Sequence, residues 1–198
     1  MKDFLKKIKR YRDISSVDEI VRRYFVMNGF DGILTVLGIV IGSYIAHVRD
    51  PSIIIITTIS TCVAIGISGF SGTFMSERAE RIRYTKILER KMLTKFHNSI
   101  INEAARFASF YSAIIAAASP IIFAIIILIP MFLTSFGLIP YMIAFYGLIG
   151  VSLLILFTLG IFLGIVSKEN VIIWGIKMSL IGLFTTLLLF FIGIIFNI

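Results

Sequence analysis

One carboxylate lies where a membrane-spanning segment would least tolerate a charge. Asp31 falls about six residues, or ~9 Å of helix, inside the first long apolar run, which extends over residues 25–47. A charge at that depth costs about 3 kcal/mol on insertion scales, so we expect it to serve a function. Lys177, at a similar depth in the last apolar run, is the candidate partner for a purely structural ion pair. Asp31 is therefore the first candidate site residue, and the ion pair is the alternative.

Small and polar residues share one helical face with Asp31. Thr35, Gly38 and Gly42 follow it at spacings of four, three and four, and Gly38-x-x-x-Gly42 is a contact motif for close helix approach. If the neighbour is the same helix of a second subunit, two Asp31 carboxylates meet near a symmetry axis. Such a pair would bind a divalent cation or share a proton. Met27, one turn before Asp31, would add a soft sulfur ligand, and packing against lipid or core is its alternative role.

A second group of candidate ligands lies in the charged segment 76–106. Glu77, Glu80 and Glu103 carry oxygen ligands that suit iron(II), manganese or zinc. They would form one site only if the helix after the second apolar run folds back beside the helix that enters the third. Arg81 lies four residues after Glu77, and basic residues outnumber acidic ones here. A solvated, salt-bridged helix pair is therefore the alternative to a metal site.

The sequence contains no enzymatic constellation. H-E-x-x-H, G-x-S-x-G and phosphate-loop motifs are absent. His47 and His97 fall on opposite sides of the predicted membrane, so they cannot share a site. Cys62, the single cysteine, excludes an internal disulfide and a cysteine cluster, and it lies in an apolar run as a small buried residue. We expect a protein that is not an enzyme and that has no cofactor.

The elements that position these residues are predicted to be membrane helices. Hydrophobic residues make up 58% of the 198 residues and charged residues 15%, whereas soluble domains have roughly 45–50% and about 25%. Five apolar runs are long enough to cross a bilayer. They cover residues 25–47, 53–75, 107–129, 141–166 and 171–196. The second run continues without a breaker into a charged helix from Ser76 to about Phe96. Asn98 and Ser99 are predicted to be a helical break, after which a further helix leads into the third run. Residues 130–140 are predicted to be an uncharged external loop, and residues 167–170 a short inner turn.

The predicted fold is thus an all-α integral membrane protein. It has five transmembrane helices and a short cytoplasmic helical extension between the second and the third. Ser16 and Glu19 form a capping box at the start of the first long helix. The predicted parts are a basic cytoplasmic arm (1–24), helices one and two (25–75), a cytoplasmic helical loop (76–106) and helices three to five (107–198).

The distribution of basic residues orients the chain. Lysines and arginines cluster before the first span and between the second and third, whereas the opposite side receives only Arg49. The positive-inside rule then places the N-terminus in the cytoplasm and the C-terminus outside. A chain rich in isoleucine and lysine points to a prokaryotic plasma membrane. Nucleic acid is not an expected partner, because basic clusters beside membrane spans hold loops in the cytoplasm and against anionic headgroups.

Three segments resemble the vacuolar iron transporter family, and together they cover most of the membrane part. The segment N-G-F-D-G-I-L-T at 28–35 resembles the family's first-span signature around D-G. The glycine-rich segment 66–72, followed by S-E-R-A-E at 76–80, resembles its second span and charged exit. Leu159-Gly160 with Gly164, and then residues 175–182, resemble its last two spans.

The resemblance implies a homodimer of five-span subunits in the lipid bilayer. It also implies a cation path along the dimer interface and proton-coupled export of iron(II) or manganese from the cytosol, with Asp31 as the pathway aspartate. Gly69 stands where better-known members have a methionine, and Thr61 stands about where they have a glutamate. The cytoplasmic insert is also shorter and poorer in glutamate than theirs. These departures favour the alternative function, a non-transporting membrane scaffold or metal sensor of the same fold.

Overall fold

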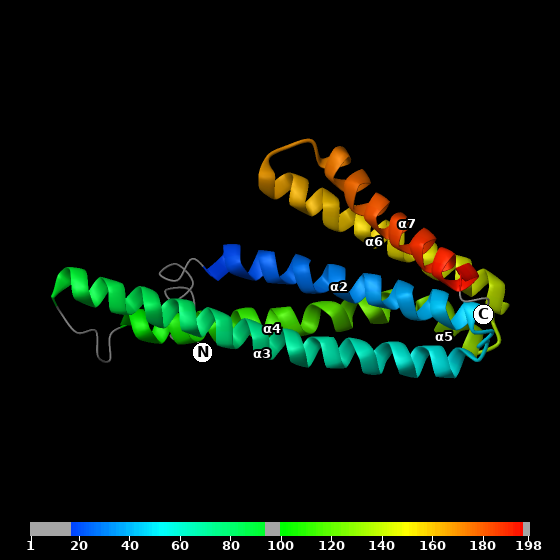
Figure 1. Ribbon diagram of the computed structural model, residues 1–198, viewed down its shortest axis with the longest axis horizontal. Helices are drawn as coiled ribbons and strands as arrows, with labels where there is room; N and C mark the ends of the chain where they lie inside the picture. The colour runs from blue at the N-terminus through cyan, green and yellow to red at the C-terminus, as the bar shows by residue number, and fades with distance from the viewer. Residues whose placement is uncertain (1–16, 94–99, 196–198) are drawn as a thin grey trace. The chain divides into compact units, whose positions relative to one another are not determined.

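The computed structural model describes residues 17–93 and 100–195, and within these ranges every regular element is a helix (Figure 1). Five helices are long and apolar enough to cross a membrane. The chain is therefore an all-α integral membrane protein, as predicted. The helices are α2 (Val17–Ile45), α3 (Pro51–Met92), α4 (Ile100–Ile127), the short α5 (Ile129–Ser135), α6 (Tyr141–Ser167) and α7 (Val171–Ile195). The basic arm up to Ser16, His97 and the predicted break at Asn98 and Ser99 lie outside the described residues.

Helix α3 is much longer than a membrane span. Its 42 residues correspond to about 63 Å, roughly twice the ~30 Å of the hydrocarbon core. After Gly72 the helix contains neither glycine nor proline, so no residue interrupts it where the apolar run gives way to charged residues. Figure 1 shows α3 running unbroken into the charged segment. The predicted extension of the second span as a charged helix is confirmed.

The segment between Pro130 and Pro140, which was predicted to be a loop, contains a helix. Helix α5 begins one residue before Pro130, because proline is tolerated in a first helical turn, where its missing N–H has no intrahelical acceptor. Burial of Met131 holds the apolar turn in place. The helix ends at Ser135 with Phe136 as its C-cap, and Gly137 follows with a φ of +73°, the left-handed backbone that glycine adopts readily.

The Cα packing divides the chain into two compact units. The first unit comprises the chain up to Asn28 and residues Gly66–Ser119, and therefore the beginning of α2, the second half of α3 and most of α4. The second unit comprises residues Gly29–Ile65 and Pro120–Ile198, which include α5, α6 and α7. The predicted division of the chain at residues 24, 75 and 106 stays a prediction, because these units reflect packing and not membrane depth.

Helices α6 and α7 form a tight hairpin within the second unit (Figure 1). A Cβ atom at Gly160 would lie 2.6 Å from the Cα of Gly175, and one at Gly164 would lie 2.6 Å from the Cα of Val171. The glycines therefore allow the two backbones to touch. The predicted inner turn joins the helices: Lys168 ends α6 in a left-handed conformation, and the Asn170 side chain accepts a hydrogen bond from the first turn of α7.

Candidate functional site

Helix α2 has one packed face and one open face. Its packed face consists of large aliphatic side chains that are completely buried, namely Ile33, Val36, Leu37, Val40 and Ile41. On the other face Met27 is 51% exposed, Asp31 and Gly42 are exposed, and Thr35 and Gly38 are half-buried. This division follows the 3.6-residue helical period. The residues that the sequence analysis placed on one stripe thus do share the open face.

In the second unit, the residue after Asp31 fixes how α2 is held. A Cβ atom at Gly32 would lie 2.7 Å from both the Cα and the Cβ of Pro120 in α4. Only glycine permits this approach of the α2 backbone to the proline. Because adjacent residues on a helix point about 100° apart, seating Gly32 on α4 turns the Asp31 side chain away from that contact.

In the first unit, the same stretch of α2 makes two further close contacts. The Asn28 amide donates to the Tyr24 carbonyl at 3.0 Å. A Cβ atom at Gly69 of α3 would lie 2.6 Å from the Asn28 Oδ1. The Ser119 hydroxyl of α4 donates to the Phe25 carbonyl at 2.6 Å. Gly69 therefore serves close packing of α3 against the Asn28 side chain.

The Asp31 carboxylate forms no hydrogen bond or ion pair with any described residue. The Thr35 hydroxyl donates to the main-chain oxygen of Asp31 at 2.7 Å, a bond within the helix that leaves the carboxylate oxygens available. Lys177 does not serve as its partner, since the Lys177 Nζ lies 5.2 Å from the centroid of the Trp174 ring. The structural ion pair that was the alternative role for Asp31 is thus not formed in the described part of the chain.

The two glycines one and two turns beyond Thr35 face empty space. A Cβ atom added at Gly38 or Gly42 would meet no atom of the described chain within 4 Å. At packed glycines such as Gly32 and Gly160, by contrast, an added Cβ atom would overlap a neighbouring helix. The open face therefore offers a thin helix surface, with one carboxylate, one hydroxyl and the Met27 thioether within two turns of each other. Such oxygen and sulfur atoms can ligate a transition-metal ion when a second set of ligands completes the site.

The charged extension of α3 is held by a buried carboxylate. Glu77 is 6% exposed, and its carboxylate lies 3.4 Å from an Arg23 nitrogen of α2 and 3.6 Å from the Arg81 Nε. The i, i+4 pair with Arg81 that the sequence indicates is present. It is not solvated as expected, because the packing of α2 in the first unit adds the second arginine and covers Glu77.

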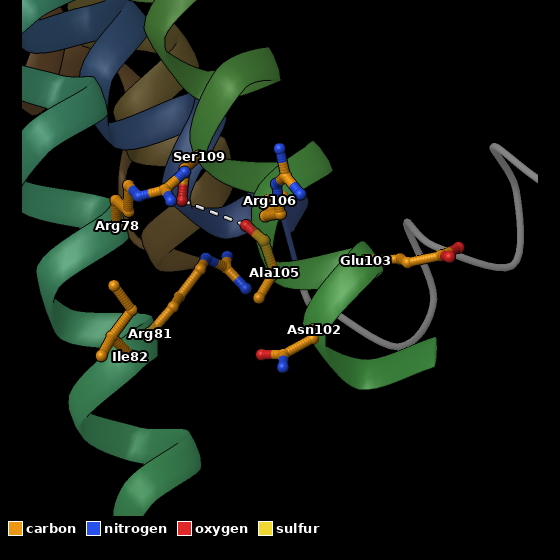
Figure 2. Close-up of a pocket in the computed structure, with 8 residues that line it drawn as sticks. All are labelled: Arg78, Arg81, Ile82, Asn102, Glu103, Ala105, Arg106 and Ser109. Carbon is orange, nitrogen blue, oxygen red and sulfur yellow. Dashed lines mark hydrogen bonds between the residues drawn. The ribbon is translucent and has the colours of Figure 1, made fainter. Parts of the chain in front are cut away.

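The structure does not bring the three loop glutamates together. Glu80 is exposed on α3, and Glu103 projects from α4 away from the Arg81 and Asn102 side chains (Figure 2). Throughout residues 17–93 and 100–195, no three His, Cys, Asp or Glu side chains lie close enough to hold one metal ion. The geometry of the described loop therefore favours the salt-bridged interpretation of Glu77.

We expect replacement of Glu77 to destabilise the protein. Glu77→Ala would leave the partly buried Arg81 guanidinium without its carboxylate partner, at a cost of about 2 kcal/mol. Glu80→Ala, an exposed position on the same helix, is the matched control and should change stability by less than about 0.5 kcal/mol. Thermal unfolding of both purified variants measures the difference. Equal stability of the two variants would contradict the structural role of Glu77.

The sequence analysis missed the residues that orient the site. Asn28 and Gly32 lie four residues apart and therefore on one helical face, next to the stripe that carries Asp31. That spacing alone predicts a second packing face on this helix. Their contacts, Gly69 and Pro120, come from distant parts of the sequence and could not be assigned from local spacing.

Comparison with known proteins finds a family match and a similar protein. The VIT family profile matches residues 22–111, which include most of α2, all of α3 and the beginning of α4. An uncharacterized protein from Methanocaldococcus jannaschii is 37% identical over 175 residues, which cover 86% of this chain and 87% of that protein. The family match includes the open face of α2 and the Arg23–Glu77–Arg81 cluster.

Proposed function

Because the chain belongs to the VIT family, whose members transport metal ions, we propose that it exports iron(II) or manganese from the cytosol as a homodimer. The observation that carries the proposal is the exposed Asp31 carboxylate, which forms no ion pair with a described residue although it lies within an apolar span. The cost of a charge at this depth has to be offset by a cation, a proton or a second polar group. A transported metal ion and a returning proton supply the first two in turn.

A second copy of α2 completes this site. With only Met27, Asp31 and Thr35 nearby, one chain provides too few ligands to surround a divalent ion. A twofold axis along the open face doubles each of them, and Gly38 and Gly42 allow the two backbones to approach. Two facing carboxylates also disfavour one another's charge, so one of them takes up a proton when the metal leaves. This supports coupling of metal export to proton entry.

The basic residues support an orientation of the chain in the membrane. Arg78, Arg81, Arg83 and Arg90 lie on the charged part of α3, and basic loops stay in the cytoplasm. We therefore propose that the charged end of α3 and the start of α4 lie on the cytoplasmic side, and the C-terminal end of α7 outside. We propose the plasma membrane of a prokaryote as the location.

The glycine face provides a direct test of the dimer. Gly38→Leu with Gly42→Leu should convert the homodimer to monomers and remove metal flux, because leucine side chains would hold the two α2 helices apart. Gly72→Leu with Gly150→Leu is the matched control, since these glycines also face open space but lie on α3 and α6. Crosslinking in membranes and metal uptake into proteoliposomes measure association and flux.

The control pair is expected to stay dimeric and active. If the α2 pair remains dimeric with normal flux, or if only the control pair dissociates, the interface is not formed by α2. Either result would show that the two Asp31 carboxylates do not meet at a twofold axis, and would overturn the proposed metal path along the dimer interface.

Two observations favour a second candidate function, a metal sensor or scaffold of the same fold. A Cβ atom at Gly69, the position where the resemblance places a methionine, would overlap the Asn28 side chain. Glycine itself offers no side-chain ligand. The Thr61 hydroxyl, near the position of the implied glutamate, donates to the Thr57 carbonyl at 2.8 Å. A sensor would bind metal at Asp31 without moving it across the membrane, so binding without flux distinguishes it from a transporter.

A further inference from the structure

A cavity lies in the first unit between the charged part of α3 and the first turns of α4 (Figure 2). It has a volume of about 300 Å³. Two helices build it, so it is not a groove on the surface of one helix. Its lining residues are Arg78, Arg81 and Ile82 from α3, and Asn102, Glu103, Ala105, Arg106 and Ser109 from α4.

The charge of this cavity is predominantly positive. Three arginines line it against one glutamate. Arg81 shares the buried Glu77 carboxylate with Arg23, whereas Arg78 and Arg106 form no ion pair with the residues that the structure describes. Figure 2 shows Arg78 and Arg81 extending from α3 toward α4, while Glu103 projects away from them. Arg78 and Arg106 therefore bring to the cavity positive charge that no described carboxylate neutralises.

Guanidinium groups that line one cavity favour a phosphate group. The planar fork of an arginine donates two parallel hydrogen bonds to phosphate oxygens, and it keeps its charge at any physiological pH. The Asn102 side chain extends from α4 toward α3 and lines the same cavity (Figure 2). The volume exceeds that of one phosphate, and Ile82 provides an apolar wall for whatever group carries it.

The predicted spans put the cavity at the depth of lipid headgroups. Arg78 follows the last residue of the second apolar run, Met75, by three residues, or about 4.5 Å of helix. Arg106 directly precedes Phe107, the first residue of the third apolar run. The headgroup layer extends for roughly 5–8 Å beyond the hydrocarbon core, so both arginines lie level with lipid phosphates.

We propose that this cavity binds a phosphate group, carried either by an anionic lipid headgroup or by a soluble phosphate compound. The site is distinct from the open face of α2, and the inference does not depend on metal transport. Arg78 and Arg106 bind the phosphate oxygens, Arg81 supports them while it remains paired with Glu77, and Glu103 weakens binding by its charge.

Equilibrium binding to the full-length protein in detergent tests the proposal. The probes are dioctanoyl phosphatidylglycerol, dioctanoylglycerol, which has the same chains without a phosphate, and inorganic phosphate. Arg78→Gln with Arg106→Gln should weaken binding of the phosphate-bearing probe at least about tenfold, since two charge-assisted contacts are lost. Arg83→Gln with Arg90→Gln is the matched control. These arginines are exposed on α3 and border a hollow formed by that helix alone.

The probes also distinguish the two sources of the phosphate. Binding of phosphatidylglycerol without competition from inorganic phosphate identifies a lipid, whereas inorganic phosphate binding of similar strength identifies a soluble compound. Equal weakening by the control pair, equal binding of dioctanoylglycerol, or no binding of any phosphate probe would overturn the proposal. If the double variant does not fold, the single variants Arg78→Gln and Arg106→Gln provide the test: each should weaken binding of the phosphate-bearing probe, and unchanged binding in both would contradict the site.

Discussion

Asp31→Asn is expected to abolish metal flux while the protein keeps its fold and its dimer. Asparagine has nearly the same shape, but it lacks the negative charge that binds a divalent ion and exchanges a proton. Loss of supporting groups around a metal costs up to about 100-fold, so the loss of the charged ligand itself should reduce uptake into proteoliposomes by at least that factor. The thermal midpoint should be unchanged or higher, because a charge has been removed from an apolar span.

The same variant tests whether Lys177 is a structural partner of Asp31. If Lys177 were the structural partner of Asp31, Asp31→Asn would leave the Lys177 ammonium unpaired within the span and lower stability, and Lys177→Met would restore stability in the double variant. The contact of Lys177 with Trp174 predicts that no such rescue occurs. Normal flux in a stable Asp31→Asn protein would refute the role of the carboxylate. Reduced stability that Lys177→Met restores would favour the ion pair instead.

The largest expected effect on stability is that of Gly160→Ala. The added methyl group would overlap the Trp174 carbonyl oxygen and lie 2.6 Å from the Gly175 Cα, and both neighbours belong to the backbone of α7. Backbone atoms cannot move aside as a flexible side chain can, so α6 and α7 must separate. We expect a loss of about 3 kcal/mol in the free energy of unfolding, at the upper end for overpacking by one methyl group.

Gly150→Ala is the matched control for this change. Gly150 lies on the same helix, and a Cβ atom there meets no described atom within 4 Å. Alanine also favours the helix over glycine by up to about 1 kcal/mol, so the control should be neutral or stabilising. Chemical denaturation in micelles compares the two variants. A similar stability of both would show that the hairpin does not depend on backbone contact at Gly160.

Local patterns were sufficient to predict the membrane helices and the open face of α2. Apolar runs of the right length indicate the spans, and the spacing of Asp31, Thr35, Gly38 and Gly42 follows from helical geometry alone. The continuous α3 was predictable because no breaker follows Gly72. The short α5 was missed, since a proline at the start of a segment is compatible with both a loop and a first helical turn.

Contacts between distant residues were beyond local patterns. Arg23 and Glu77 are 54 positions apart, and nothing in either neighbourhood shows that α2 packs on the charged part of α3 in the first unit. The contact of Gly32 with Pro120 is of the same kind. Depth in the membrane suggested Lys177 as a partner for Asp31, but equal depth does not fix the direction of a side chain around its helix.

The most direct test of metal transport is uptake by the wild-type protein in proteoliposomes under an imposed proton gradient. Iron(II), manganese, cobalt and zinc are supplied in turn, and a trapped fluorescent chelator reports entry. Iron(II) or manganese should enter several times faster than in protein-free vesicles, and uptake should fall when the gradient is dissipated. Binding of these metals to the purified dimer with no flux of any of the four would contradict transport and would establish the sensor function instead.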